Sequence, residues 1–159
     1  MYREQDFEEI SAQLRARRAV LLSAVGAVLA LAIVSFALRW PQAVTAGLTI
    51  VALCAFIFCY AMFVYPLRAY RKHIDQALHG HTHTTQGVFT EMEADSVVRE
   101  GVRLVPFNVN VGAGVRDDGN RLFYYDANLP RPDWQAGETL LITSHDNRVT
   151  DWTRVKIKA

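Results

Sequence analysis

Three histidines alternate along a short polar stretch near the middle of the chain: His79, His81 and His83. Residues two apart in an extended segment point to the same face, so the three imidazoles could lie side by side. Imidazole nitrogens are common ligands of Zn²⁺, Ni²⁺ and Cu²⁺. The spacing indicates a metal- or ligand-sensing site, with zinc or nickel as the candidate cofactor. The alternative is a polar linker that binds no ion, because the stretch itself contains no cysteine or carboxylate as a further ligand.

The other reactive side chains do not have the spacing of a catalytic site. Ser144, His145 and Asp146 are consecutive, so they cannot face one another as a hydrolase triad requires, and no Gly-x-Ser-x-Gly sequence surrounds Ser144 or Ser96. Residues 112–114 are glycine-rich but lack the Lys-Ser/Thr pair of a phosphate-binding loop. We therefore expect a protein that is not an enzyme.

Two apolar runs, residues 19–38 and 43–65, make up much of the first half of the chain. Neither contains a charged residue, and each is long enough to cross a hydrocarbon core of about 30 Å. The link between them, Arg39–Gln42, is so short that two helices must form an antiparallel hairpin. Residues 19–65 are thus predicted to be a transmembrane hairpin in the lipid bilayer. The lack of ionisable groups at depth argues against a transporter or channel.

Small residues recur four apart in the first apolar run: Ser23, Gly26, Ala27 and Ala30. This spacing lets helix backbones approach closely and predicts helix packing, including a homo-oligomer. Cys54 and Cys59 in the second run lie about 140° apart around a helix, so we expect no disulfide between them.

Charged segments flank the hairpin on both sides. Residues 1–18 begin acidic and end basic, which suits a cytosolic N-terminal helix that leads into the first span; a helix lying on the membrane surface is the alternative. Residues 66–80 are predicted to form an amphipathic juxtamembrane helix that ends at Gly80. Basic residues gather outside the two runs, whereas the link contains only Arg39, so both termini are predicted to be cytoplasmic in a bacterial inner membrane. These basic residues are Arg15, Arg17, Arg18, Arg68, Arg71 and Lys72.

From residue 84 onward the apolar pattern changes to that of β-strands. Turn residues at Asp117–Asn120 and His145–Asn147 separate predicted strands, and the prolines of Asn128–Trp134 predict a long ordered loop held by Trp134. Residues 84–159 are therefore expected to form an all-β domain, a five-stranded barrel of the OB or SH3-like kind. The strands are predicted near residues 85–91, 102–111, 121–126, 138–144 and 147–157.

The composition of the β domain bears on its partner. After Gly80 the chain has nine basic and eleven acidic residues, so it lacks the basic surface that nucleic acid requires. Tyr124, Trp134 and Trp152 are candidate partner-binding aromatics, and the edge of the barrel could accept an added strand. We expect an accessory or scaffold protein whose β domain binds a membrane protein partner.

The closing segment carries a resemblance. Gly137-Glu138-Thr139-Leu140-Leu141-Ile142-Thr143 through Asn147-Arg148-Val149 resembles the last hairpin of the OB-like domain in NfeD-type membrane proteins. The order of elements, spanning helices followed by a small β barrel, is also similar to that of NfeD-type proteins. The chain resembles small two-span membrane proteins with such a barrel as well. The resemblance implies a cytosolic barrel that acts as an interaction module with membrane partners of the stomatin type. The long Asn128–Trp134 loop and the presence of only two spans depart from that family.

Overall fold

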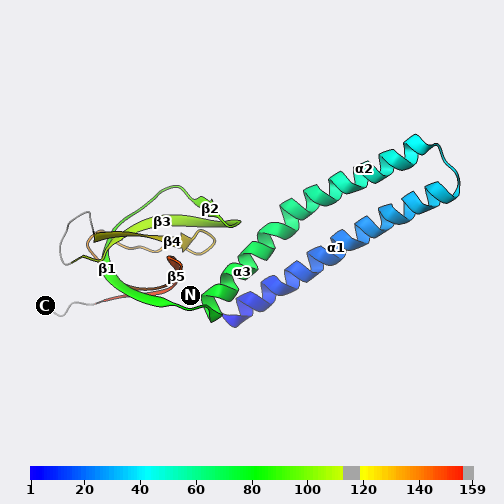
Figure 1. The fold of residues 1–159 in the computed structure, drawn as a ribbon. Coiled ribbons are helices and arrows are strands. Elements are labelled where there is room, and N and C mark those ends of the chain that lie inside the picture. The colour runs from blue at the N-terminus through cyan, green and yellow to red at the C-terminus, as the bar shows by residue number, and fades with distance from the viewer. Residues whose placement is uncertain (113–118, 156–159) are drawn as a thin grey trace. The chain divides into compact units, whose positions relative to one another are not determined.

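A computed structural model of the protein describes residues 1–112 and 119–155. The chain divides into two compact units, one formed by Glu8–Arg68 and the other by Met1–Phe7 together with Ala69–Ala159. Figure 1 shows the helices first in chain order and the strands after them. The predicted turn at Asp117–Asp118, the glycine-rich residues 113–114 and the predicted end of the last strand at 156–157 lie outside the described residues.

Two long helices form the first half of the chain. α1 (Glu4–Ala37) is continuous through the charged N-terminal segment, and α2 (Gln42–Cys59) follows after a short turn. Two helical stretches, Glu4–Ala37 and Gln42–His79, are long and apolar enough to cross a membrane, judged by length and composition. The predicted pair of apolar helices is therefore confirmed, since an uncharged run of this length favours helix.

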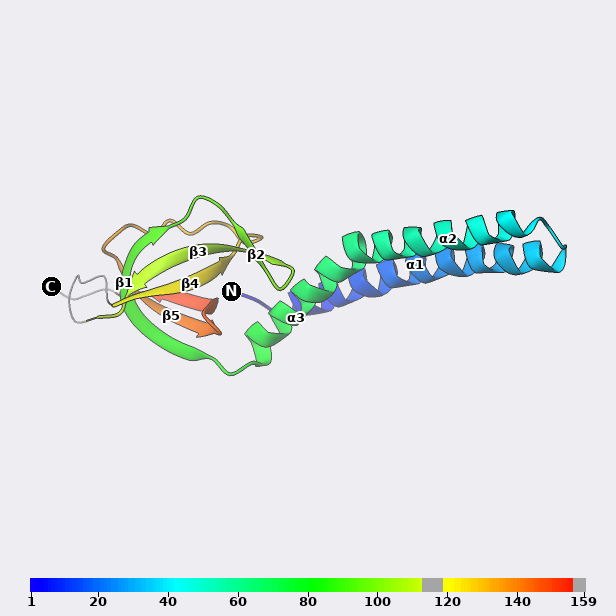
Figure 2. The ribbon, with the colours of Figure 1, turned by 45° about the horizontal axis from the view of Figure 1, so that its top comes forward.

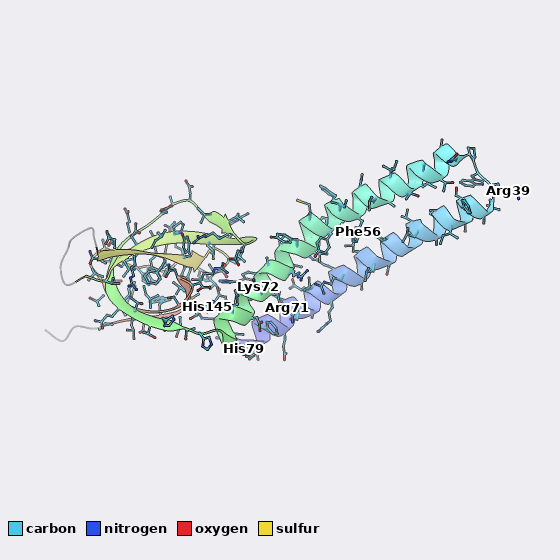
Figure 3. All side chains as sticks on the ribbon, in the orientation of Figure 1. Arg39, Phe56, Arg71, Lys72, His79 and His145 are labelled. Atoms are coloured by element: carbon cyan, nitrogen blue, oxygen red, sulfur yellow. The ribbon has the colours of Figure 1, made fainter. Side chains whose placement is uncertain are left out.

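The turn between the helices is closed by the backbone. Arg39 has a positive φ of 53°, and the N–H of Trp40 donates to the carbonyl oxygen of Ser35 across 3.1 Å. This pattern is the Schellman motif, which satisfies carbonyls at the end of α1. Pro41 is the N-cap residue that precedes α2, where its missing N–H costs no hydrogen bond of the helix. Figure 3 shows Arg39 in this turn.

The second helix does not break at Pro66. A π-helical turn, η1 (Tyr60–Val64), joins α2 to α3 (Tyr65–His79). Proline in a helix lacks an N–H donor, and its ring would clash with the carbonyl four residues earlier, here that of Met62. The wider π turn before Pro66 relieves that clash, so the predicted span and the predicted juxtamembrane helix follow each other without a loop.

The rest of the chain folds into a mixed sheet. Its order is β1-β5-β6-β4-β3-β2, and β1 also pairs with β3. The β4–β6 pairing is parallel and the others are antiparallel. Each of the five predicted strands corresponds to an observed one, whereas β2 was not predicted. The strands are β1 (His83–Met92), β2 (Val97–Arg99), β3 (Val102–Asn110), β4 (Asn120–Asp126), β5 (Thr139–His145) and β6 (Arg148–Arg154).

Buried and less buried residues alternate along the strands, as in β5, so one face of the sheet supplies the core. In Figure 2, β1 curves along its length with β3, β4 and β5 beside it. The predicted β domain is confirmed at the level of a six-stranded mixed sheet.

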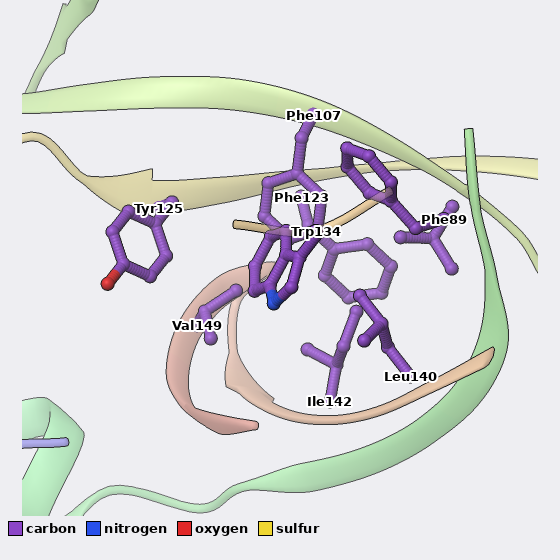
Figure 4. Close-up of a cluster of buried hydrophobic side chains, with 9 residues drawn as sticks. Phe89, Phe107, Phe123, Tyr125, Trp134, Leu140, Ile142 and Val149 are labelled. Carbon is purple, nitrogen blue, oxygen red and sulfur yellow. The ribbon is translucent and has the colours of Figure 1, made fainter. Parts of the chain in front are cut away.

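Trp134 is central to the core of the β domain. The indole is 9% exposed, and its ring lies 5.0 Å from that of Phe107, 5.4 Å from Phe89 and 5.7 Å from Tyr125. Figure 4 shows it among the aliphatic and aromatic side chains of the strands. The loop between β4 and β5 is therefore held as predicted, through a tryptophan that fills the interior.

Candidate functional site

The three predicted histidines have different surroundings. His79 ends α3 (Figure 3), with its Nε2 3.4 Å from Glu4 Oε1 and its Nδ1 3.2 Å from Asp75 Oδ1. His81 precedes β1, and His83 is the first residue of that strand. Within residues 1–112 and 119–155, no group of three or more His, Cys, Asp or Glu side chains is arranged to hold a metal ion. The metal-sensing hypothesis stays a prediction.

The small residues of α1 lie on its exposed side. Ser23, Gly26, Ala27 and Ala30 are all exposed, and a Cβ added to Gly26 would meet no atom within 4 Å. A different set of positions on α1 is shielded, and Ser35 among them is in hydrogen-bond contact with Thr45 of α2, 2.8 Å between the hydroxyls. The small residues are thus left for contacts outside the single hairpin.

The predicted partner-binding aromatics are divided between interior and surface. Trp134 lies in the core, and half-buried Trp152 packs against it with 5.1 Å between ring centroids. Tyr124 is half-buried, and the guanidinium of Arg99 lies 4.4 Å from the centroid of its ring. Of the three, Tyr124 is the residue next to the exposed strand β2, since Arg99 is the last residue of that strand.

A buried carboxylate that the sequence did not indicate accepts three hydrogen bonds. Asp126, the last residue of β4, is 1% exposed. Its Oδ2 accepts hydrogen bonds from the hydroxyls of Tyr2 (2.9 Å) and Tyr70 (2.8 Å). Its Oδ1 accepts one from the backbone N–H of Asn128 at 2.9 Å. These partners satisfy a charge that would be costly to bury alone.

His73 completes this cluster. Its Nε2 lies 3.0 Å from the Tyr2 hydroxyl, and its ring stacks on that of Tyr70 at 6.2 Å. Because the Tyr2 hydroxyl gives its single hydrogen to Asp126, His73 Nε2 acts as the donor to Tyr2. We call Tyr2, Tyr70, His73 and Asp126 the Asp126 cluster. It joins the N-terminal segment, α3 and the end of β4.

The electrostatics of the Asp126 cluster keep its phenols and imidazole neutral. Burial lowers the pKa of His73; the charge of Asp126 opposes this shift, and that of Arg148 adds to it. Burial and the nearby Asp126 carboxylate raise the pKa of Tyr2 and of Tyr70. Neither phenol is activated as a nucleophile, so the chemistry of the cluster is hydrogen bonding between segments.

Sequence reasoning missed the Asp126 cluster because Tyr2 and Asp126 are 124 residues apart. One signal was present: Tyr70, His73 and Ile74 fall on one face of a helix, and two of these three residues are polar. Polar side chains on the buried, apolar face of an amphipathic helix need hydrogen-bond partners in the interior, so these two residues indicated a buried polar contact.

A second feature is the edge of the sheet at β2, which pairs on one side only among residues 1–112 and 119–155. This strand is last in the sheet order and is hydrogen-bonded to β3. Its valines are exposed, Val97 by 37% and Val98 by 69%. Next to it, Glu100 pairs with Arg148 at 3.0 Å, and this hydrogen-bonded arginine lowers the pKa of the Glu100 carboxyl.

No protein-family model, curated protein or solved structure matches this chain. The resemblance of the closing segment to NfeD-type proteins therefore stays a prediction. The candidate sites rest on the geometry of the chain itself, namely the Asp126 cluster as a joint between segments and the β2 edge as an open surface.

Proposed function

We propose that this protein is a non-enzymatic accessory or scaffold protein of a bacterial inner membrane. In this proposal the apolar runs at residues 19–38 and 43–65 cross the bilayer, and both termini are cytoplasmic. Support comes from the two apolar helices and from the basic residues outside them, opposed by Arg39 alone in the turn. The β domain is then the part that meets a second membrane protein in the cytosol.

We further infer that the sheet closes into a five-stranded barrel of the OB kind. The supporting observation is a cycle of pairings, β1–β5–β6–β4–β3 and back to β1. Strands within a closed barrel have no free edges. β2 pairs only with β3 and lies outside this cycle, so it is the strand that keeps an edge.

The β2 edge carries the functional proposal. Exposed edge strands present unpaired backbone groups to another chain, and natural proteins usually protect them with charge or cover. β2 is short and ends with Arg99, but its first two residues, Val97 and Val98, leave apolar side chains exposed at this edge. The occupant we propose is an extended segment of a second membrane protein that adds a strand beside β2.

Site-specific photocrosslinking in native membranes tests this proposal. A photoreactive amino acid at Val98 should give one discrete adduct with a second protein, identified by mass spectrometry. The matched control is Gln86, which is exposed but lies within β1 at a position paired with β5. Equal labelling from Gln86 and Val98, or no adduct from Val98, would overturn the proposal.

A substitution provides an independent check. Val98→Lys places a charge on the exposed edge and should abolish the complex between this protein and its partner at β2. The midpoint of unfolding should stay at the wild-type value. Thr153→Lys, at an exposed position of β6, is the control and should leave the complex intact. Full recovery of the complex with Val98→Lys would contradict a role for this edge.

A further inference from the structure

A cavity of about 230 Å³ opens beside the turn between β5 and β6. Its walls come from the beginning of β1, the beginning of β4 and this turn. The polar side chains that line it are His83, Thr85, Arg121, Ser144, Asp146 and Asn147, and Phe123 forms part of its wall. All of these residues belong to the unit that contains the β sheet.

Strand alternation places these polar residues in phase with the core. Thr85 is two residues from buried Gly87, Arg121 is two from buried Phe123, and Ser144 is two from buried Ile142. Residues two apart share a face of the sheet, so the cavity continues the interior of the domain at one end. The chain thus lines this end of the sheet with the guanidinium of exposed Arg121, the imidazole of exposed His83 and the hydroxyls of Thr85 and Ser144.

Arg121 supplies the cation of this cavity. Among the described residues no ion pair, hydrogen bond or ring contact engages its guanidinium, whereas Arg99, Arg148 and Arg154 each have such a partner. A guanidinium presents donors in a planar fork that matches the oxygens of a carboxylate or phosphate. The hydroxyls of Thr85 and Ser144 can donate to the same oxygens.

Asp146 sets a limit on the charge of the ligand. Its carboxylate lies 3.6 Å from His145 Nε2, and His145 Nδ1 is 2.8 Å from the carbonyl oxygen of His81, to which it must donate. Since Asp146 also lines the cavity, a second negative charge on the ligand would be repelled. A singly charged oxyanion fits better than a doubly charged one.

We propose that this cavity binds a small singly charged oxyanion through Arg121, with His83, Thr85 and Ser144 as further hydrogen-bond partners. Its volume lies below the roughly 300 Å³ at which ordinary ligand pockets begin, which suits an ion-sized group with few carbon atoms. A free carboxylate or phosphate and the phosphate of a lipid headgroup share this chemistry. The proposal is independent of the partner-binding role assigned to β2.

Calorimetric titration of the full-length protein in phosphatidylcholine nanodiscs tests the proposal. Sodium acetate, which is singly charged, is the probe, and sodium chloride at equal ionic strength is the blank. We expect saturable binding that weakens at least about tenfold in Arg121→Gln, the factor of one lost charge-assisted hydrogen bond. Arg103→Gln, which changes an exposed arginine on β3, should bind as the wild type does.

Asp146→Asn tests whether the ligand is negatively or positively charged. Removing the carboxylate should tighten the binding of an oxyanion several-fold, whereas a cationic ligand would be lost. Adding phosphatidic acid to the nanodiscs distinguishes a lipid headgroup from a soluble ion as the ligand. If the lipid phosphate occupies the cavity, the apparent affinity for the added soluble oxyanion falls; if the ligand is a soluble ion, that affinity is unchanged. Absence of saturable binding by wild type, equal binding by Arg121→Gln, or weaker binding by Asp146→Asn would overturn the proposal.

Discussion

The hydroxyl of Tyr70 donates a hydrogen bond of 2.8 Å to the carboxylate of Asp126, 56 residues further along the chain. Tyr70 lies on α3, which directly continues the second apolar helix, and Asp126 ends a central strand of the sheet. Because Tyr2 binds the same carboxylate oxygen, one buried charge fixes two separate segments to the β domain. Substitutions in the Asp126 cluster therefore test the stability of the unit that contains the β sheet.

Tyr70→Phe removes one hydrogen bond to a buried charge and keeps the ring. We expect it to lower the free energy of unfolding of the β domain by about 1.5–3 kcal/mol. Asp126→Ala should cost more, about 2–6 kcal/mol, because it leaves two part-buried phenols without their acceptor, at about 1–3 kcal/mol each. Urea denaturation of the full-length protein in detergent, followed by tryptophan fluorescence, measures both. Tyr65→Phe changes an exposed phenol and is the control; a loss as large as that of Tyr70→Phe would contradict the assignment.

Stability should fall on acidification because of His73. Burial depresses the pKa of the folded His73 below its usual value, so the unfolded chain binds the proton more readily. The contribution of His73 is then complete above about pH 6.5 and is lost as the pH falls toward the folded pKa. The charged groups around it, Asp126, Glu100 and Arg148, are unchanged in His73→Gln, which keeps an N–H donor.

The measurement is the free energy of unfolding of wild type and His73→Gln at about pH 7.5 and about pH 5.5, on either side of the usual histidine pKa. Wild type should lose more stability over this interval than the variant. Equal losses of the free energy of unfolding in the two proteins would show that a group other than His73 causes the loss of stability on acidification.

The sequence predicted what local composition determines. Uncharged runs of sufficient length predicted the two helices, and period-two alternation predicted five strands within a few residues. β2 was not predicted, because its three residues are all exposed and show no alternation of buried and exposed positions. The Asp126 cluster escaped because its members come from three distant segments, and no local pattern brings Tyr2 to Asp126.

The loop tryptophan shows a mixed outcome. The prolines of Asn128–Trp134 correctly predicted an ordered loop held by Trp134. Sequence alone could not tell whether that indole faces a partner or the interior, since both surroundings suit a large aromatic ring. Contacts with Phe89 and Phe107, on strands distant in sequence, place it inside.

Trp134→Ala should be among the most destabilising substitutions in the β domain. It empties a site between Phe89, Phe107 and Tyr125, and the expected loss is about 3–5 kcal/mol. Trp134→Phe should cost less, because it keeps an aromatic ring in the core, while both variants remove the buried indole N–H that has no hydrogen-bond partner in the described structure. Thermal unfolding followed by circular dichroism tests the ranking, with Trp40→Ala, exposed in the helix turn, as the control. Equal losses for the two Trp134 variants would contradict the role assigned to the aromatic ring in filling the core.

Gly26→Leu should disrupt self-association of the protein without unfolding the chain. A Cβ at Gly26 meets open space, so a larger side chain is tolerated within one copy. If copies pack through the exposed small residues of α1, leucine prevents the close backbone approach and should reduce cross-linked dimer several-fold. Gly47→Leu is a matched control, because Gly47 of α2 is also exposed with open space around its Cβ position. Chemical cross-linking in membranes gives the readout, and equal dimer yields from the two variants would rule out α1 as the contact face.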